Sequence, residues 1–103
     1  MTFKEHTVSE LNDQFRGGGS GITLTQGASA LPHVMGLLWE ISRYDKFTPD
    51  NDPYGEHDFG TIKWKGQKVF WKIDYYDEAT ESWADPLSST CHRVLTVMLA
   101  EEY

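Results

Sequence analysis

The residues best suited to chemistry in this chain lie in one short segment, residues 50–60, which reads Asp-Asn-Asp-Pro-Tyr-Gly-Glu-His-Asp-Phe-Gly. This segment contains one imidazole, His57, and the carboxylates of Asp50, Asp52, Glu56 and Asp58. Each ionisable group must be solvated or paired to be tolerated in a folded protein. A segment so rich in such groups, and so poor in apolar side chains to bury, is therefore a candidate site.

Acid/base catalysis is the enzymatic chemistry that this segment suits best. His57 lies between two carboxylates, an arrangement that suits a proton relay. If the protein is an enzyme, we expect its catalytic residues to be His57, Glu56, Asp58 and Asp74. The alternative is structural, with the aspartates capping turns and His57 pinning the loop by hydrogen bonds.

Metal binding fits the segment less well. Asp50, Asp52, Gly55 and Asp58 fall where positions one, three, six and nine of an EF-hand loop would fall, but position twelve, which needs a bidentate acid, is Thr61. The four histidines show no paired spacing, and a single cysteine cannot build a zinc site. We predict no metal and no cofactor. A looser divalent-cation site built from Asp50, Asp52, Glu56 or Asp58 stays open as an alternative.

Length and composition predict a single domain over residues 1–103, soluble and cytoplasmic. The lone Cys91 fits a reducing compartment, and the N-terminus lacks the pattern of a signal peptide. No apolar stretch reaches the ~20 residues that span a bilayer. The formal net charge of -7 argues against a general nucleic-acid or membrane binder, because both need local positive potential.

The negative charge is concentrated in two segments. Residues 45–58 and 74–85 each hold five carboxylates, against the single base Lys46. Such segments favour binding to a basic protein surface, with exposed aromatic side chains as anchors. The predicted partner-binding residues are Asp50, Asp52, Tyr54, Glu56, Asp58, Tyr76, Asp77, Glu78, Glu81 and Trp83. A solvated face that serves only solubility is the competing interpretation.

The pattern of apolar residues predicts an α+β fold with the order α-β-α-β-β-α. We expect a three-stranded, mostly antiparallel sheet covered by three helices. The first helix is predicted over residues 3–15 with a capping box at Thr2 and Glu5, and a glycine-rich linker follows at 17–21. Outside the hairpin, we further predict a strand at 22–26, a helix at 31–44 and a loop at 45–58. We expect a last helix at 86–101, capped by Asp85 and Pro86.

The clearest local signal is a hairpin of residues 59–64 and 67–75 around the turn Lys65-Gly66. It places Ile62 opposite Val69 and Gly60 opposite Trp71. The predicted core face carries Ile62, Trp64, Val69, Trp71, Ile73 and Tyr75, and the opposite face carries Lys63, Lys68, Phe70, Lys72, Asp74 and Tyr76. Lysines interleaved with aromatic residues can grip phosphates and stack bases, so a nucleic-acid-binding hairpin is a further alternative. The core placement of Trp64 and Trp71 argues against it.

Four longer strings resemble a known family over nearly the whole chain. They are residues 11–16, 50–60, 70–77 and 93–103. With them the chain resembles family 3768 of the bacterial domains of unknown function. The resemblance implies a small stand-alone bacterial or phage protein, often near mobile elements, with a similar loop and no assigned activity.

The leading hypothesis is therefore a non-enzymatic acidic protein-binding domain acting through residues 45–58 and 74–85. Its most concrete form is an inhibitor of a nucleic-acid-handling host defence complex, similar to anti-CRISPR proteins, which mimics nucleic acid in a basic groove. The alternatives are the acid/base or metal-assisted enzyme centred on His57 and the nucleic-acid-binding hairpin. The sequence predicts no oligomeric state.

Overall fold

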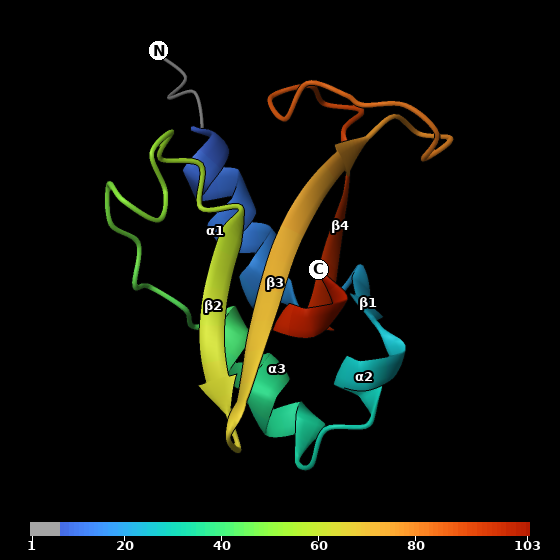
Figure 1. Ribbon diagram of the computed structural model, residues 1–103. Coiled ribbons are helices and arrows are strands. Elements are labelled where there is room, and N and C mark those ends of the chain that lie inside the picture. The colour runs from blue at the N-terminus through green and yellow to red at the C-terminus, as the bar shows by residue number, and fades with distance from the viewer. Residues whose placement is uncertain (1–6) are drawn as a thin grey trace.

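The computed structural model describes residues 7–103 and shows one four-stranded sheet with helices packed against it (Figure 1). The elements follow one another as α1 (Val8–Gly18), β1 (Ile22–Leu24), α2 (Gln26–Ser29), α3 (Val34–Ser42), β2 (Phe59–Trp64), β3 (Gln67–Tyr76), β4 (His92–Leu99) and the 3-10 helix η1 (Ala100–Glu102). None of the helices within the described residues is long and apolar enough to cross a membrane. The mixed α+β class is as predicted.

The sheet has the strand order β1-β4-β3-β2. The hairpin register is confirmed, since Ile62 pairs with Val69 and Gly60 with Trp71. The prediction of three strands was wrong, because a fourth strand, β4, lies in the middle of the sheet. Strand β4 pairs antiparallel with β3 and parallel with β1, so the sheet is only partly antiparallel.

The prediction of a last helix over residues 86–101 was wrong. Residues 92–99 form strand β4, which alternates so that Leu95 and Val97 point to the core, while Met98 is buried on the opposite face. A strand with apolar residues on both faces carries consecutive apolar residues, and over a short run this pattern cannot be told from a helical stripe. The expected cap at Asp85 instead makes a local turn, in which its carboxylate accepts the backbone N–H of Leu87 at 2.9 Å.

The other two predicted helices have different bounds in the structure. Helix α1 continues through Gly17 and Gly18, which were predicted to belong to the linker 17–21. Helix α1 begins at Val8 with a capping box formed by Thr7 and Glu10, while the predicted capping residues Thr2 and Glu5 lie outside the described residues. Helix α3 covers only part of the predicted 31–44. Before it, Thr25 caps the four-residue helix α2, so β1 ends at Leu24 rather than at residue 26.

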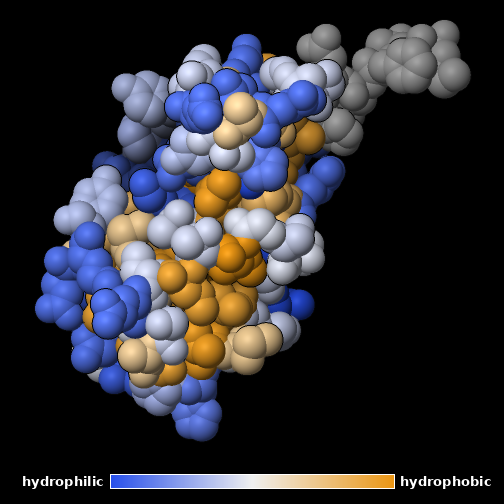
Figure 2. Space-filling model, turned by 90° about the vertical axis from the view of Figure 1, so that its right-hand side faces the viewer, coloured by the Kyte–Doolittle hydropathy of each residue, from blue (hydrophilic) through white to orange (hydrophobic). Residues whose placement is uncertain are grey.

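The core lies between the sheet and helices α1 and α3, which pack behind the sheet in Figure 1. Strand β3 supplies Val69, Trp71, Ile73 and Tyr75, each at most 8% exposed, as predicted for that face. The other face of the sheet carries no long helix, and there Phe59, Phe70 and Tyr103 form an aromatic cluster. Figure 2 shows the side of the molecule toward β1 and α2, where an apolar area is bordered by polar residues.

Candidate functional site

The two acidic segments lie at the same end of the sheet. The loop 45–58 leads into β2 and the loop 77–91 follows β3, and these strands are antiparallel. The end of one is therefore beside the start of the other. In Figure 1 the loop 45–58 runs up the left side to the start of β2 at the top, where the loop 77–91 also leaves β3, whereas the hairpin turn Lys65-Gly66 lies at the bottom. The fold thus separates an acidic end from the lysine-rich hairpin turn.

The loop 45–58 is held by its own polar side chains. Asn51 accepts the backbone N–H of Thr48 at 2.9 Å and donates to the carbonyl of Lys46 at 2.9 Å. The Asp52 carboxylate accepts the backbone N–H groups of Glu56 and His57 at 3.1 and 3.2 Å, and its side chain is only 7% exposed. Asp52, predicted as a partner-binding residue, therefore supports the loop from inside.

His57 faces helix α1. Its Nδ1 lies 3.0 Å from an Asp13 carboxylate oxygen, and its ring stacks on Phe47 with centroids 3.9 Å apart. Its Nε2 lies 3.8 Å from Asp52. The backbone of His57 adopts a left-handed conformation with φ of 57°. These contacts fit the structural alternative, in which His57 pins the loop to the first helix.

A buried arginine links the contact between His57 and Asp13 to the core. Arg16 is 4% exposed and lies over the rings of Phe47 and Trp71, with its guanidinium carbon 5.4 and 5.0 Å from their centroids. Its Nη2 donates to Asp13 at 3.0 Å and to the carbonyl of Tyr44 at 2.8 Å. Asp13 therefore holds both Arg16 and His57. Neither Asp13 nor Arg16 was singled out from the sequence.

A second buried network fixes the other side of the loop. The amide nitrogen of Asn12, which is fully buried, donates to the carbonyl of Glu56 at 2.9 Å and to the hydroxyl of Tyr75 at 2.8 Å. The amide oxygen of Asn12 accepts from Nε of Arg93 at 2.7 Å, and Arg93 also donates to the carbonyl of Pro86 at 2.7 Å. One side chain on α1 thus ties together both loops of the acidic end.

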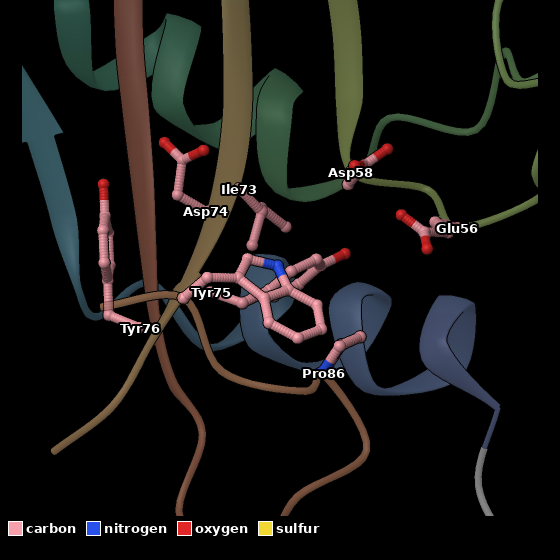
Figure 3. A pocket seen from close by; sticks show the side chains of 8 residues that line it. Glu56, Asp58, Ile73, Asp74, Tyr75, Tyr76 and Pro86 are labelled. Atoms are coloured by element: carbon pink, nitrogen blue, oxygen red, sulfur yellow. The ribbon is translucent and has the colours of Figure 1, made fainter.

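Between the two loops lies a pocket of about 430 Å³ (Figure 3). Its lining consists of Glu56, Asp58, Ile73, Asp74, Tyr75, Tyr76, Trp83 and Pro86. The structure therefore brings together three members of the predicted catalytic set, the carboxylates of Glu56, Asp58 and Asp74. His57, the fourth member, does not line this pocket.

The carboxyl groups of the pocket are perturbed by their surroundings. Burial raises the pKa of Glu56, and the charge of Asp58 and a hydrogen bond with that carboxyl raise it further. Burial also raises the pKa of Asp58, partly offset by hydrogen bonds, while the charges of Asp52 and Asp74 add to the rise. Burial raises the pKa of Tyr75 to about 12. The carboxylate of Asp74 pairs with Lys72 at 3.0 Å.

The segment after β3 carries exposed charge on a hydrogen-bonded turn. The Asp77 carboxylate accepts the backbone N–H of Glu81 at 3.1 Å, and the backbone N–H of Asp77 donates to the carbonyl of Ser82 at 2.8 Å. Glu78 and Glu81 are exposed, and so is Trp83, at 71%. Within the described residues, no lysine or arginine pairs with Asp77, Glu78 or Glu81.

The predicted partner-binding residues therefore fall into three groups. The first group lines the pocket and consists of Glu56, Asp58, Tyr76 and Trp83. The second group accepts hydrogen bonds from loop backbone and consists of Asp52 and Asp77. The remaining four are exposed on the loops, namely Asp50, Tyr54, Glu78 and Glu81. No three His, Cys, Asp or Glu side chains among residues 7–103 are arranged to hold a metal ion, so the divalent-cation alternative gains no support.

The lysine-rich hairpin does not present the surface that nucleic-acid stacking needs. Trp71 is fully buried, as predicted, and the indole of Trp64 is half-buried and donates to the carbonyl of Pro32 at 2.8 Å. Lys72 is paired with Asp74. Only Phe70, half-buried beneath Lys68, remains of the predicted aromatic set.

These features define a small α+β domain with an acidic pocket at one end of its sheet. Residues 24–102 match the family described as "Protein of unknown function (DUF3768)", and the chain belongs to this family. The match confirms the family expected from the sequence strings, although the string 11–16 lies outside the matched residues, and it includes the pocket residues and both acidic loops. No curated protein and no solved structure matches the chain.

Proposed function

We propose that this protein is a non-enzymatic binding domain that presents its acidic end to a basic surface of a partner protein. The observation that supports this most is the position of the two acidic segments, which the antiparallel hairpin places together although they are separate in the sequence. A concentrated negative potential speeds encounter with a basic partner and selects against acidic ones.

The state of the carboxylates also supports recognition. Asp50, Glu78 and Glu81 are exposed and, within residues 7–103, have no cationic partner. Carboxylates that served the fold alone would be paired or would cap backbone, as Asp52 does. Tyr54, 89% exposed, adds an aromatic side chain of the kind that anchors interfaces.

The most concrete form of the proposal is an inhibitor of a nucleic-acid-handling host defence complex. A groove that binds nucleic acid is lined with lysine and arginine, and an acidic protein of this size can occupy such a groove in place of the phosphate backbone. Location in the cytoplasm and association with mobile elements belong to the same proposal.

The test is partner capture from host lysate by immobilised protein, with identification by mass spectrometry. The triple variant Asp50→Lys, Glu78→Lys, Glu81→Lys should lose the partner at physiological salt, because it reverses exposed charges at the acidic end. The matched control adds the same positive charge outside both acidic segments, at four exposed positions, namely Gln26→Lys, Glu40→Lys, Gln67→Lys and Glu101→Lys. The control has the same net charge and should retain the partner. Equal loss by both variants, or by neither, would contradict the proposal.

A second candidate function is acid/base catalysis by Glu56 and Asp58. The mutual perturbation of two carboxyl groups in a pocket favours it, since such pairs occur at catalytic sites. It would need no histidine, in contrast to the mechanism expected from the sequence. Glu56→Gln separates the two functions. Loss of cellular activity with partner capture retained would favour catalysis, whereas parallel loss of both would favour binding.

A further inference from the structure

The tryptophans of this protein differ in whether a cation lies over their rings. A cation of the same chain lies 5.0 Å from the ring centroid in three cases, which are Arg16 over Trp71, Arg43 over Trp39 and Lys65 over Trp64. Within the described residues, no such partner covers the fourth, Trp83. Trp83 is also the tryptophan that lines the acidic pocket.

The position of Trp83 is set by backbone hydrogen bonds rather than by burial. Trp83 forms a β-bridge with Tyr76, and the next residue, Ala84, donates its N–H to the carbonyl of Tyr75 at 3.3 Å. The side chain nevertheless remains 71% exposed. The backbone therefore holds a large aromatic surface in place without burying it in the core, as a preformed binding wall would require.

The rest of the pocket complements a positive charge with a flat shape. Glu56 and Asp58 come from the loop before β2, and the buried side chains of Ile73 and Pro86 add apolar surface. Among residues 7–103, no lysine or arginine lines the pocket. Two cations of the sheet contact lining residues, and both are already engaged. Lys72 pairs with Asp74 at 3.0 Å, and Arg93 donates to the Asn12 amide oxygen and to the carbonyl of Pro86, at 2.7 Å each.

We propose that this pocket binds one arginine side chain of the basic partner, with the guanidinium plane over the ring of Trp83 and its N–H groups donating to the carboxylates of Glu56 and Asp58. This inference rests on the proposed function and identifies the anchoring contact within it. The aromatic wall and the cavity distinguish the pocket from the solvated carboxylates elsewhere on the two loops.

Arginine fits the pocket better than lysine. A guanidinium is planar, stacks on aromatic rings and donates to two carboxylate oxygens at once, whereas an ammonium is a strongly hydrated point charge. The protein itself shows the preferred geometry, because Arg16 and Arg43 already lie over Trp71 and Trp39. The raised pKa values of Glu56 and Asp58 further imply that binding weakens as the pH falls and these groups take up protons.

The test is an NMR titration of the full chain with N-acetyl-arginine amide, with N-acetyl-lysine amide as the comparison, both at constant ionic strength. The indole N–H resonance of Trp83, assigned with Trp83→Ala, should shift in a saturable way. Asp58→Asn should raise the dissociation constant about tenfold, through loss of a charge-assisted hydrogen bond. The lysine compound should bind several-fold more weakly. Trp39→Ala, which removes another exposed tryptophan, should leave the titration unchanged.

Several outcomes would overturn the inference. These are equal shifts at Trp39 and Trp83, equal binding of both compounds, or a titration of Asp58→Asn that matches the unmodified protein. Because Trp83 is exposed, Trp83→Ala provides a second variant, and it should lose binding of the arginine compound with the remaining backbone resonances unchanged. If the triple loop variant loses the partner but the arginine compound does not bind, the proposed function stands and the pocket assignment falls. If the arginine compound binds but the triple variant still captures the partner, the pocket assignment stands and the proposed function falls.

Discussion

Asn12 is the side chain whose removal tests the architecture of the acidic end most sharply. It is fully buried and makes hydrogen bonds of 2.9, 2.8 and 2.7 Å to the Glu56 carbonyl, the Tyr75 hydroxyl and Nε of Arg93. In Asn12→Ala these three groups lose their partner. A buried polar group left unpaired costs about 1–3 kcal/mol.

The three costs do not add in full. Arg93 keeps its hydrogen bond to the carbonyl of Pro86, and water can enter the space that the amide leaves. We therefore expect Asn12→Ala to lower the free energy of unfolding by about 3 kcal/mol, a large share of the about 5–15 kcal/mol typical of a domain. Urea denaturation followed by circular dichroism measures this change. Gln14→Ala, on the exposed side of the same helix, is the control and should change it by less than about 0.5 kcal/mol.

A double-mutant cycle with Tyr75→Phe separates the network from a simple cavity effect. If Asn12 and Tyr75 are coupled through their 2.8 Å hydrogen bond, the double variant should be more stable than the sum of the single changes predicts, by about 1 kcal/mol. A loss of less than about 1 kcal/mol in Asn12→Ala, or strict additivity with Tyr75→Phe, would refute the reasoning.

Three further predictions follow from the same contacts. Gly60→Ala should lower stability by about 1–3 kcal/mol in urea denaturation, because an added Cβ would clash with the indole ring of the buried Trp71. An unchanged midpoint would show that the indole can move. Glu56→Gln should gain thermal stability relative to the unmodified protein as the pH rises from about 4 to 7. The raised pKa of Glu56 means that its contribution to stability is present below the ordinary value of 4.5 and lost as the pH rises through the raised value; a pH-independent difference would contradict this. His57→Ala removes the contact of the loop 45–58 with Asp13, so it should open this loop to limited proteolysis while partner capture persists. Loss of capture without new cleavage would contradict a role of His57 in holding the loop.

The hairpin and the position of the acidic loops could be predicted from the sequence, because both follow from local signals. The turn Lys65-Gly66 and the alternation around it determine the register. Once β2 and β3 are antiparallel, the loop before one and the loop after the other must share an end. Strand β4 could not be predicted in the same way, since Val94 and Met98 add apolar residues on its second face and the sequence then lacks the apolar–polar alternation that identifies a strand.

The pocket contains candidates from both acidic segments, because the predicted hairpin already places the two segments at one end of the sheet; they are Glu56, Asp58, Asp74, Tyr76 and Trp83. Glu56 and Asp58 were recognised as candidates, but the chain alone could not show that their neighbour His57 turns toward α1. The contacts that decide this, His57 with Asp13 and Asn12 with Arg93, join residues 44 and 81 positions apart. A polar residue on a helix gives no local sign that it will be buried, so Asn12 and Arg16 were missed.

The central claim, that the acidic end is the binding surface, is tested most directly by the association rate constant for the captured partner, measured against salt concentration. For the unmodified protein and for the control variant Gln26→Lys, Glu40→Lys, Gln67→Lys, Glu101→Lys, the rate constant should fall steeply as salt rises. For Asp50→Lys, Glu78→Lys, Glu81→Lys it should be low and nearly independent of salt. The same steep dependence in all three proteins would contradict the claim.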